Sequence, residues 1–512
     1  MRNVSISLIQ KATGSEIIQI ENKQIDILKK MTICFFIMKT MQEVEDMIDL
    51  AVTKYGTYQS VRSNAGFALF RGIAYAKPPI GDRRWKAPED IEPFEGVKLC
   101  DKYGNACAQY DRWDKATDDI NDDSGYPYIR IENYPYPPMM SEDCLYLNIY
   151  TPAENMNSKL PVMIYIHGGG LQQWYSSDYE YCGDNFCRNG VILVSINYRL
   201  NVFGYFCHPE LKKESEHNAS GNYGLMDQIK AVKWVRDNIE AFGGDPHNLT
   251  VFGQSAGGRS SLAVVCSPLS EHAISHVSIQ SAGGLGNIMR DSSYETQEKM
   301  GIDFMKMCGC DSLEEMSKLD WQTLRDFNDR LGFFKGFNMC TDGYVLPEDI
   351  ETMIVNNTMD DIDVIIGCTA DEGANEKEPM FGTNTFAQVR AFAKTKYLNN
   401  CKKSFVYVFD RKQPGDDAGV PHSCDNRYQF GTLDGSWRPY TKEDYDLSKQ
   451  MTAYWSSFAK SGDPNGEGLP NWDSYDEEEK VMKLCVEGPH MEKYEDRKLK
   501  ELTEKMINSY KK

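Results

Sequence analysis

The chain lacks a segment that could cross a membrane as a helix. Its 512 residues contain no stretch of about 18 consecutive apolar residues, the least that such a helix needs. The best apolar run, Met31–Met38, is followed by no small-residue cleavage site and continues into the acidic stretch 43–49. We therefore predict neither a membrane span nor a signal peptide.

Basic residues are also scarce. The chain has 56 Lys and Arg against 76 Asp and Glu, which gives a formal net charge of −20 at pH 7. Proteins bind nucleic acids by neutralising phosphates with Lys and Arg, so this balance argues against a nucleic-acid partner. An acidic surface of this kind is typical of a protein that stays in solution.

The cysteines do not form a metal-ligand pattern. There are fifteen, an odd number, scattered from Cys34 to Cys485. Cys308 and Cys310 have no second ligand pair at zinc spacing, so we predict no metal site. Mostly free thiols in a reducing compartment are the default for such a chain, and we expect a cytoplasmic protein, with secretion as the alternative.

Internal repeats are absent, and the pattern of apolar residues is that of a large α/β domain. Residues 1–50 fit it poorly, and we interpret them as an N-terminal extension of unknown role before a single domain, 51–512. Helix-forming segments, most clearly Leu225–Phe242, alternate with β-rich runs, which predicts a largely parallel sheet with helices on both faces. The runs are 67–70, 145–150, 162–166, 191–196, 249–252, 277–280, 364–366 and 405–409.

The pentapeptide QSAGG occurs twice, around Ser255 and around Ser281. In the first copy a strand runs into Gly253-Gln254-Ser255-Ala256-Gly257, and a helix-forming run follows. A G-x-S-x-G turn between strand and helix presents its serine as a nucleophile, and small residues on each side let the two elements pass. In the second copy Ile279 replaces the first glycine, so Ser255 is the candidate nucleophile and Ser281 is not. Because G-x-S-x-G is common by chance, the motif needs partners.

A glycine-rich loop, His167-Gly168-Gly169-Gly170, opens directly after the apolar run 162–166. Upstream of G-x-S-x-G, such a loop is typical of an oxyanion hole, in which backbone N–H groups bind an oxygen that gains charge. A plain glycine turn is the alternative. The two motifs together predict an acid and then a histidine further along the chain.

Histidine is rare, with eight in the chain, and this narrows the choice of base. Those after Ser255 are His272, His276, His422 and His490. The first two follow the nucleophile helix too closely and the last lies in a polar tail, which selects His422. For the acid, the run 364–366 leads to Asp371 and Glu372, and the residues alone leave both open because adjacent acids in a loop are usually solvated.

Several longer segments resemble one known family, the type-B carboxylesterases, which are the carboxylesterase–cholinesterase group of α/β-hydrolases. The likeness covers about residues 55–475, and the C-terminal half is closer in style to bacterial than to animal members. The segments that carry it, beside the two motifs above, are 70–81, 141–148, 197–200, 224–228, 238–246 and 455–465.

The resemblance implies an α/β-hydrolase fold for residues 51–512, with a large, mostly parallel sheet and long insertions around a deep pocket. It implies Glu372, within Asp-Glu-Gly, as the acid and His422 as the base. The oxyanion donors would be the N–H groups of Gly169, Gly170 and Ala256, and Ser281 would support the triad near Glu372. No cofactor or metal is implied, and the partner would be a small-molecule ester bound by a monomer or weak homo-oligomer.

The chain also departs from this family. Gln254 stands before the nucleophile where the family usually has Glu, whose charge helps cholinesterases to hold choline, so acetylcholine is a poor candidate substrate. Cys107 and Cys144 match a family pair, which implies a disulfide in a secreted protein and two thiols in a cytosolic one. Trp113 is the one tryptophan in the loop between these cysteines.

We therefore expect a serine carboxylester hydrolase. One alternative keeps this fold for aryl or carbohydrate esters of the feruloyl type, because the loop 126–138 is rich in Tyr and Pro. A less favoured alternative is a catalytically inactive, cholinesterase-like binding protein. Such relatives typically lose the nucleophilic serine, which this chain keeps.

Overall fold

The computed structural model describes residues 47–109, 139–286, 293–332, 335–372 and 381–510. The run Met31–Met38, Trp113 and the loop 126–138 lie outside these residues. Ile48–Lys512 forms one compact unit. Its first strand begins at Leu50, which pairs with Gln59, so the unit starts slightly before the boundary predicted after residue 50.

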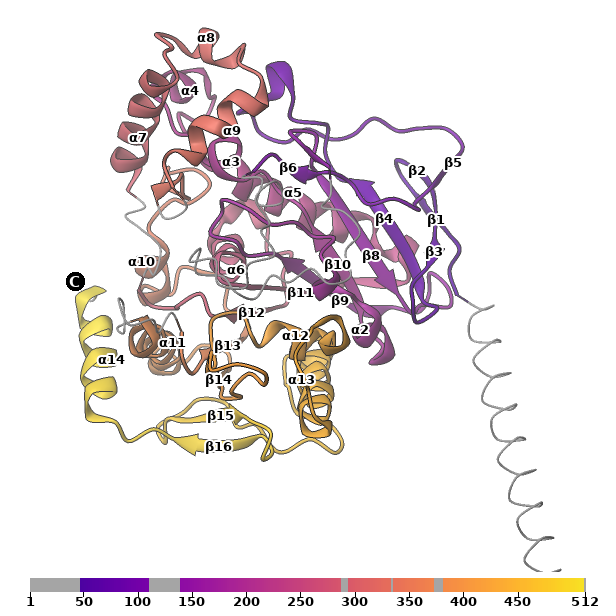
Figure 1. Cartoon of the computed structure of the whole chain (residues 1–512), viewed down its shortest axis with the longest axis vertical. Helices are drawn as coiled ribbons and strands as arrows, with labels where there is room; N and C mark the ends of the chain where they lie inside the picture. The colour runs from indigo at the N-terminus through magenta and orange to yellow at the C-terminus, as the bar shows by residue number, and fades with distance from the viewer. Residues whose placement is uncertain (1–46, 110–138, 287–292, 333–334, 373–380, 511–512) are drawn as a thin grey trace, which may run out of the picture. The chain divides into compact units, whose positions relative to one another are not determined.

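An eleven-stranded mixed sheet forms the centre of this unit (Figure 1). The strands from β15 to β10 run parallel to their neighbours, while β16, β8, β4 and β3 are antiparallel at the two edges. In spatial order they are β16 (His490–Lys493), β15 (Lys480–Leu484), β14 (Ser404–Phe409), β13 (Asp363–Thr369), β12 (His276–Gln280), β11 (Gly244–Gln254), β9 (Leu160–Ile166), β10 (Ile192–Ile196), β8 (Tyr146–Thr151), β4 (Ala68–Ala74) and β3 (Val61–Arg62). All eight predicted β-rich runs fall in this sheet, which confirms the mostly parallel α/β architecture.

Two small sheets lie beside the central one. The first has the order β1 (Leu50–Thr53), β2 (Gly56–Gln59), β5 (Val97–Leu99), and the second pairs β6 (Ala106–Cys107) with β7 (Met140–Ser141). Sequence patterns predicted neither, because their strands are short and several carry exposed side chains.

Helices cover both faces of the central sheet (Figure 1). One face carries α2 (Asp184–Arg188), α12 (Asn426–Phe430) and α13 (Lys442–Ser461), and the other carries α5 (Tyr223–Asn238), α6 (Ala256–Cys266) and α11 (Phe381–Leu398). The remaining helices are α3 (Asn201–Tyr205), α4 (Pro209–Glu214), α7 (Tyr294–Met307), α8 (Leu313–Ser317), α9 (Trp321–Asp329), α10 (Ile350–Val355) and α14 (Arg497–Tyr510). Within the described part of the chain, no helix is long and apolar enough to cross a membrane.

The predicted helix 225–242 corresponds to α5 and a following 3-10 turn, Ile239–Phe242. Gly243 ends it with φ +81°, a left-handed conformation that glycine adopts without strain. The chain then enters β11, the strand that leads to Ser255.

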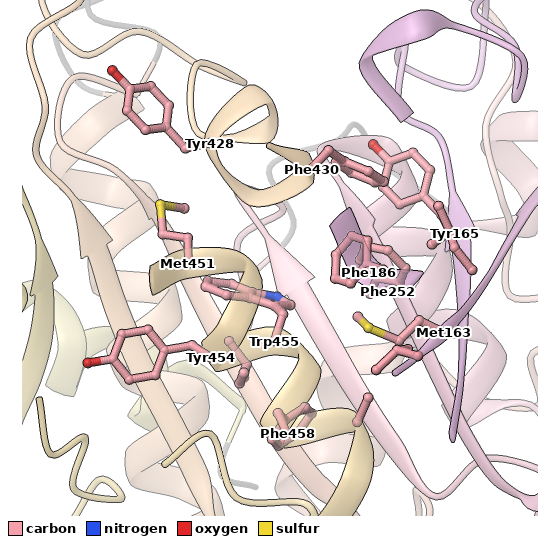
Figure 2. Packing of buried hydrophobic residues seen from close by; sticks show 14 of the residues in the cluster. Met163, Tyr165, Phe186, Phe252, Tyr428, Phe430, Met451, Tyr454, Trp455 and Phe458 are labelled. Atoms are coloured by element: carbon pink, nitrogen blue, oxygen red, sulfur yellow. The ribbon is translucent and has the colours of Figure 1, made fainter. Parts of the chain in front are cut away.

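A large aromatic core fills the space between the sheet and α13 (Figure 2). Tyr165 of β9 and Phe252 of β11 pair in register, with their rings 4.9 Å apart. Trp455 of α13 packs into the same cluster, and its indole N–H donates to Ser278 Oγ at 2.8 Å. The sheet and α13 are thereby packed together through side chains of both.

Candidate active site

The turn at Ser255 joins the end of β11 to the start of α6. Ser255 has φ +57° and ψ −126°, a conformation that residues other than glycine rarely adopt. A Cβ added at Gly253 would lie 2.5 Å from the carbonyl carbon of Gly257, and one added at Gly257 would lie 2.0 Å from Ile166 O. Both glycines are therefore needed for strand and helix to pass, as the G-x-S-x-G pattern predicts.

Ser281 has a different setting. It follows β12 and is completely buried, and no helix begins in the described residues directly after it, 282–286. Its hydroxyl lies beside the Glu372 carboxylate without the geometry of a full hydrogen bond. A buried hydroxyl cannot reach a substrate, so the position of Ser281 suits a supporting role.

The glycine-rich loop follows β9 and lies against the Ser255 turn. A Cβ added at Gly168 would lie 3.2 Å from Ser255 Cβ. Ala256 is the first residue of α6, where backbone N–H groups have no acceptor within the helix. Two backbone segments with donor groups thus meet beside the Ser255 side chain.

The loop itself requires glycine. Gly169 and Gly170 have φ +92° and +64°. A Cβ added at Gly169 would lie 2.1 Å from Gln173 O, so no other residue fits. The carbonyl of Gly169 accepts the N–H groups of Gln172 and Gln173, which tightens the turn.

His167 stabilises the start of this loop. Its ring stacks on Tyr198 with the centroids 4.5 Å apart, and the Tyr198 hydroxyl donates to His167 O at 2.8 Å. Burial lowers the pKa of His167 to about 4, so the ring is neutral at neutral pH. His167 therefore acts on the loop as a packed, uncharged side chain.

His422 and Glu372 come together from the loops after β14 and β13. His422 Nδ1 lies 2.5 Å from Glu372 Oε2. The other carboxylate oxygen, Oε1, accepts the Thr369 N–H at 3.1 Å and the Thr369 hydroxyl at 3.0 Å. The carboxylate is thus fixed, and its bond to Nδ1 makes Nε2 the basic atom of the imidazole.

The two groups shift each other's pKa. Burial alone would lower the pKa of His422, but the charge and hydrogen bond of Glu372 outweigh burial and raise it above the ordinary histidine value. Burial would raise the pKa of Glu372, yet His422 lowers it below the ordinary glutamate value. Glu372 is therefore charged at neutral pH, ready to stabilise an imidazolium.

Asp371, the alternative acid, points to different atoms. Its Oδ2 accepts the Val420 N–H at 2.8 Å, and the Asp371 N–H donates to Val420 O at 3.2 Å. These bonds brace the loop that carries His422, two residues further on. Asp371 is thus placed to shape this loop, and Glu372 contacts the imidazole.

Asp425 is a third acid near the imidazole, and sequence reasoning did not select it. It is completely buried and accepts the Tyr407 hydroxyl on Oδ2 at 3.0 Å. Burial raises the pKa of Asp425 to about 6, and the charge of Glu372 adds to this effect. The Asp425 charge in turn helps to raise the pKa of His422. The spacing His-x-x-Asp was the one available signal, and it does not reveal burial.

Gln254 makes an unexpected contact with the imidazole. Its Nε2 lies 3.1 Å from His422 Nε2. With the Nδ1 proton directed at Glu372, the amide N–H donates to the Nε2 lone pair. Among the described hydrogen bonds none joins the Ser255 hydroxyl to His422, so Gln254 holds the atom that would accept the serine proton. Catalytic hydrogen bonds often form fully only with substrate bound.

Asp425→Asn should extend activity to lower pH. His422 is the predicted base, and a base must be neutral to accept a proton, so kcat/KM should fall as the pH drops through the pKa of His422. Removing the Asp425 charge lowers that pKa, and the acidic limb of the profile should therefore move to lower pH. Asn can still accept the Tyr407 hydroxyl, so kcat at pH 8 should stay within about threefold of wild type. A limb that stays in place or moves upward in pH–rate profiles of the two proteins would refute this role.

Cys107 and Cys144 are free, buried thiols in the structure and interact with each other. Within the described residues, no group of three or more His, Cys, Asp or Glu side chains is arranged to hold a metal ion.

Comparison with known proteins gives the family. A family model described as "Carboxylesterase family" matches residues 53–400 and 378–502. The chain belongs to the carboxylesterase family. The para-nitrobenzyl esterase of Bacillus subtilis (strain 168) is 31% identical over 484 residues, covering 84% of this chain and 93% of that protein. Carboxylesterase 5A of Canis lupus familiaris is 28% identical over 488 residues, covering 81% of each.

Solved structures agree with this family. A PNB esterase structure superposes with a TM-score of 0.77 at 29% identity, covering 89% of this chain and 99% of that one. The fold is that of the α/β-hydrolases, and the chain is a hydrolase of carboxylic esters, as the sequence motifs predicted.

Proposed function

We propose that this carboxylesterase works through an acyl-enzyme on Ser255. The observation that carries the proposal is the 2.5 Å contact between His422 Nδ1 and Glu372 Oε2, because it fixes the tautomer that accepts a proton at Nε2. When substrate binds, His422 Nε2 exchanges its hydrogen bond from the Gln254 amide for one from the Ser255 hydroxyl.

Ser255 then attacks the ester carbonyl while His422 takes its proton, and Glu372 stabilises the resulting imidazolium. The tetrahedral oxyanion is bound by the N–H groups of Gly169, Gly170 and Ala256, each worth about 3–4 kcal/mol of barrier. His422 returns the proton to the leaving alcohol. Water then attacks the acyl-enzyme carbonyl while His422 takes the water proton. The bond to Ser255 breaks, His422 returns the proton to the serine oxygen, and the carboxylic acid leaves.

Partitioning by an added alcohol tests this mechanism. Acetate esters with different leaving groups should give the same ratio of methyl acetate to acetate in aqueous methanol, because all pass through one acetyl-enzyme. Ratios that change with the leaving group would mean that water attacks the ester directly.

We propose small, neutral alkyl or aryl esters as substrates. The printed name of the Bacillus subtilis relative, a para-nitrobenzyl esterase, supports this class. The feruloyl-type alternative rests on the loop 126–138, which lies outside the described residues. The alternative of an inactive binding protein is less favoured because such relatives typically lose the nucleophilic serine, and this chain keeps Ser255.

The enzyme should not strongly prefer cationic choline esters. A quaternary ammonium group is held by aromatic faces and a nearby carboxylate, and Gln254 offers an amide instead. Cation–π contacts alone give only about 0.5–2 kcal/mol, so kcat/KM for butyrylcholine should exceed that for a neutral isosteric butyrate by no more than about tenfold. Gln254→Glu should raise the ratio of kcat/KM for butyrylcholine to kcat/KM for the neutral butyrate. A wild-type ratio well above about ten, which is 1.4 kcal/mol, would contradict the prediction.

We further propose that the chain acts as a monomer or weak homo-oligomer. A cytoplasmic location, with secretion as the alternative, is supported by the odd number of cysteines. We also propose an N-terminal extension of unknown role, predicted at residues 1–50, before the catalytic domain.

A further inference from the structure

Two cysteine thiols meet away from the candidate active site. Cys207 follows α3, and Cys340 lies in the segment before α10. Both are completely buried and form a small cluster with Tyr294 of α7. The cluster therefore connects the loop between α3 and α4 with two other parts of the chain, α7 and the segment before α10.

Gly221 allows the two sulfur atoms to approach. Its φ is +102°, and a Cβ added there would lie 3.0 Å from Cys340 Sγ and 3.5 Å from Cys207 Sγ. Both sulfurs thus border the space that a larger residue would fill. A residue larger than glycine at this position would press against both thiols.

Hydroxyl groups surround Cys207. Its Sγ lies 3.5 Å from Ser220 Oγ, which is 2.9 Å from the Tyr294 hydroxyl. The Cys340 thiol donates to Ser220 O at 3.6 Å. The neighbouring Cys340 thiol is the main cause that lowers the pKa of Cys207, with Ser220 and Tyr294 contributing, against the effect of burial.

Cys207 differs in this respect from other buried cysteines of the chain. Burial raises the pKa of the Cys187, Cys266 and Cys485 thiols. The Ser220 hydroxyl beside Cys207 Sγ, itself bonded to the Tyr294 hydroxyl, can stabilise a thiolate there, which is the reactive form of cysteine. Cys207 is therefore the attacking thiol of the pair, and Cys340, in the same cluster, is the thiol that completes a disulfide.

We propose that Cys207 and Cys340 form a reversible redox pair that hydrogen peroxide oxidises to a disulfide. The Cys207 thiolate attacks the O–O bond, becomes a sulfenic acid, and releases water after protonation of the leaving oxygen. The Cys340 thiol then attacks the sulfenic sulfur, the S–O bond breaks, and a second water leaves. Two thiols lose two electrons and the peroxide gains them. The resulting bond ties the segment before α10 to the end of α3, independently of ester hydrolysis.

The test treats the reduced full-length chain with hydrogen peroxide in the presence of dimedone, which traps sulfenic acids. Free thiols are then alkylated and peptides are mapped by mass spectrometry. Wild type should yield a Cys207–Cys340 cross-linked peptide that dithiothreitol removes. Cys340→Ser should instead accumulate a dimedone adduct on Cys207, and Cys207→Ser should leave Cys340 as a free thiol. Cys485→Ser, which removes a buried thiol outside the cluster, should cross-link as wild type does.

Two results would overturn the proposal. One is wild-type protein that keeps Cys207 and Cys340 as free thiols after methionines have become oxidised. The other is equal labelling by dimedone in the two variants, with as much adduct on Cys340 in Cys207→Ser as on Cys207 in Cys340→Ser. The wild-type map needs no substitution, so it remains decisive even if a variant fails to fold. Ester hydrolysis is not the readout, so failure here is separate from failure of the proposed mechanism.

Discussion

Ser255→Ala should lower kcat for p-nitrophenyl esters by about a million-fold, the loss seen when a serine nucleophile acting with a histidine base is removed. The reason is chemical: alanine has no oxygen to form an acyl-enzyme, and the remaining oxyanion donors can only assist direct attack by water. The effect is measured as steady-state kcat, after subtraction of the activity of contaminating esterases in a mock purification.

The matched control is Ser281→Ala, in the second QSAGG. Ser281 is completely buried beside Glu372, and the Glu372 carboxylate keeps both bonds from Thr369 when the serine hydroxyl is removed. We expect a loss of no more than about tenfold, which is less than a full hydrogen bond to a charged group would give, because the Ser281 hydroxyl lacks the geometry of such a bond. An inactive Ser281→Ala enzyme beside an active Ser255→Ala enzyme would reverse the assignment of the two serines.

Glu372→Gln should lower kcat by about 10⁴-fold, as expected when the acid that orients a catalytic imidazole becomes an amide. A glutamine can present its N–H to His422 Nδ1, which favours the tautomer with the proton on Nε2. That tautomer cannot accept the Ser255 proton. The variant also removes the charge that raises the pKa of His422, so the acidic limb of its pH profile should move to lower pH.

Asp371→Asn is the neighbouring control. The asparagine keeps an oxygen that can accept the Val420 N–H, so the loop that carries His422 should hold its position. The expected loss is within about fivefold, since the net contribution of one neutral hydrogen bond is near 1 kcal/mol. A loss in Asp371→Asn as large as that in Glu372→Gln would show that the two acids do not divide their roles in this way.

Sequence patterns predicted the parts of the fold that depend on local composition. The β-rich runs of the parallel strands are almost continuously apolar because helices cover both faces, and this made them visible. By contrast, β16 is a polar edge strand with the sequence HMEK, and its pairing with β15 has no comparable local pattern. The nucleophile turn was predictable because its glycines are required by contacts between adjacent elements.

The finer features of the site depend on tertiary contacts. Asp371 and Glu372 are neighbours in sequence, and only the path of the loop from β13 directs one to Val420 and the other to His422. Gln254 was identified as a departure from the family, but its contact with His422 spans 168 positions of the chain. Asp425 looks like any loop acid until its burial is known.

The most direct test of the central claim is covalent labelling with a fluorophosphonate, which phosphonylates an activated serine. Incubation of the native enzyme should stop esterase activity and add one phosphonyl group per chain, and tryptic mapping should place it on Ser255. The Glu372→Gln variant should be phosphonylated far more slowly, because His422, oriented by Glu372, activates the serine both for ester hydrolysis and for phosphonylation. A phosphonyl group on Ser281 or another residue, or full inhibition with Ser255 unmodified, would contradict the account.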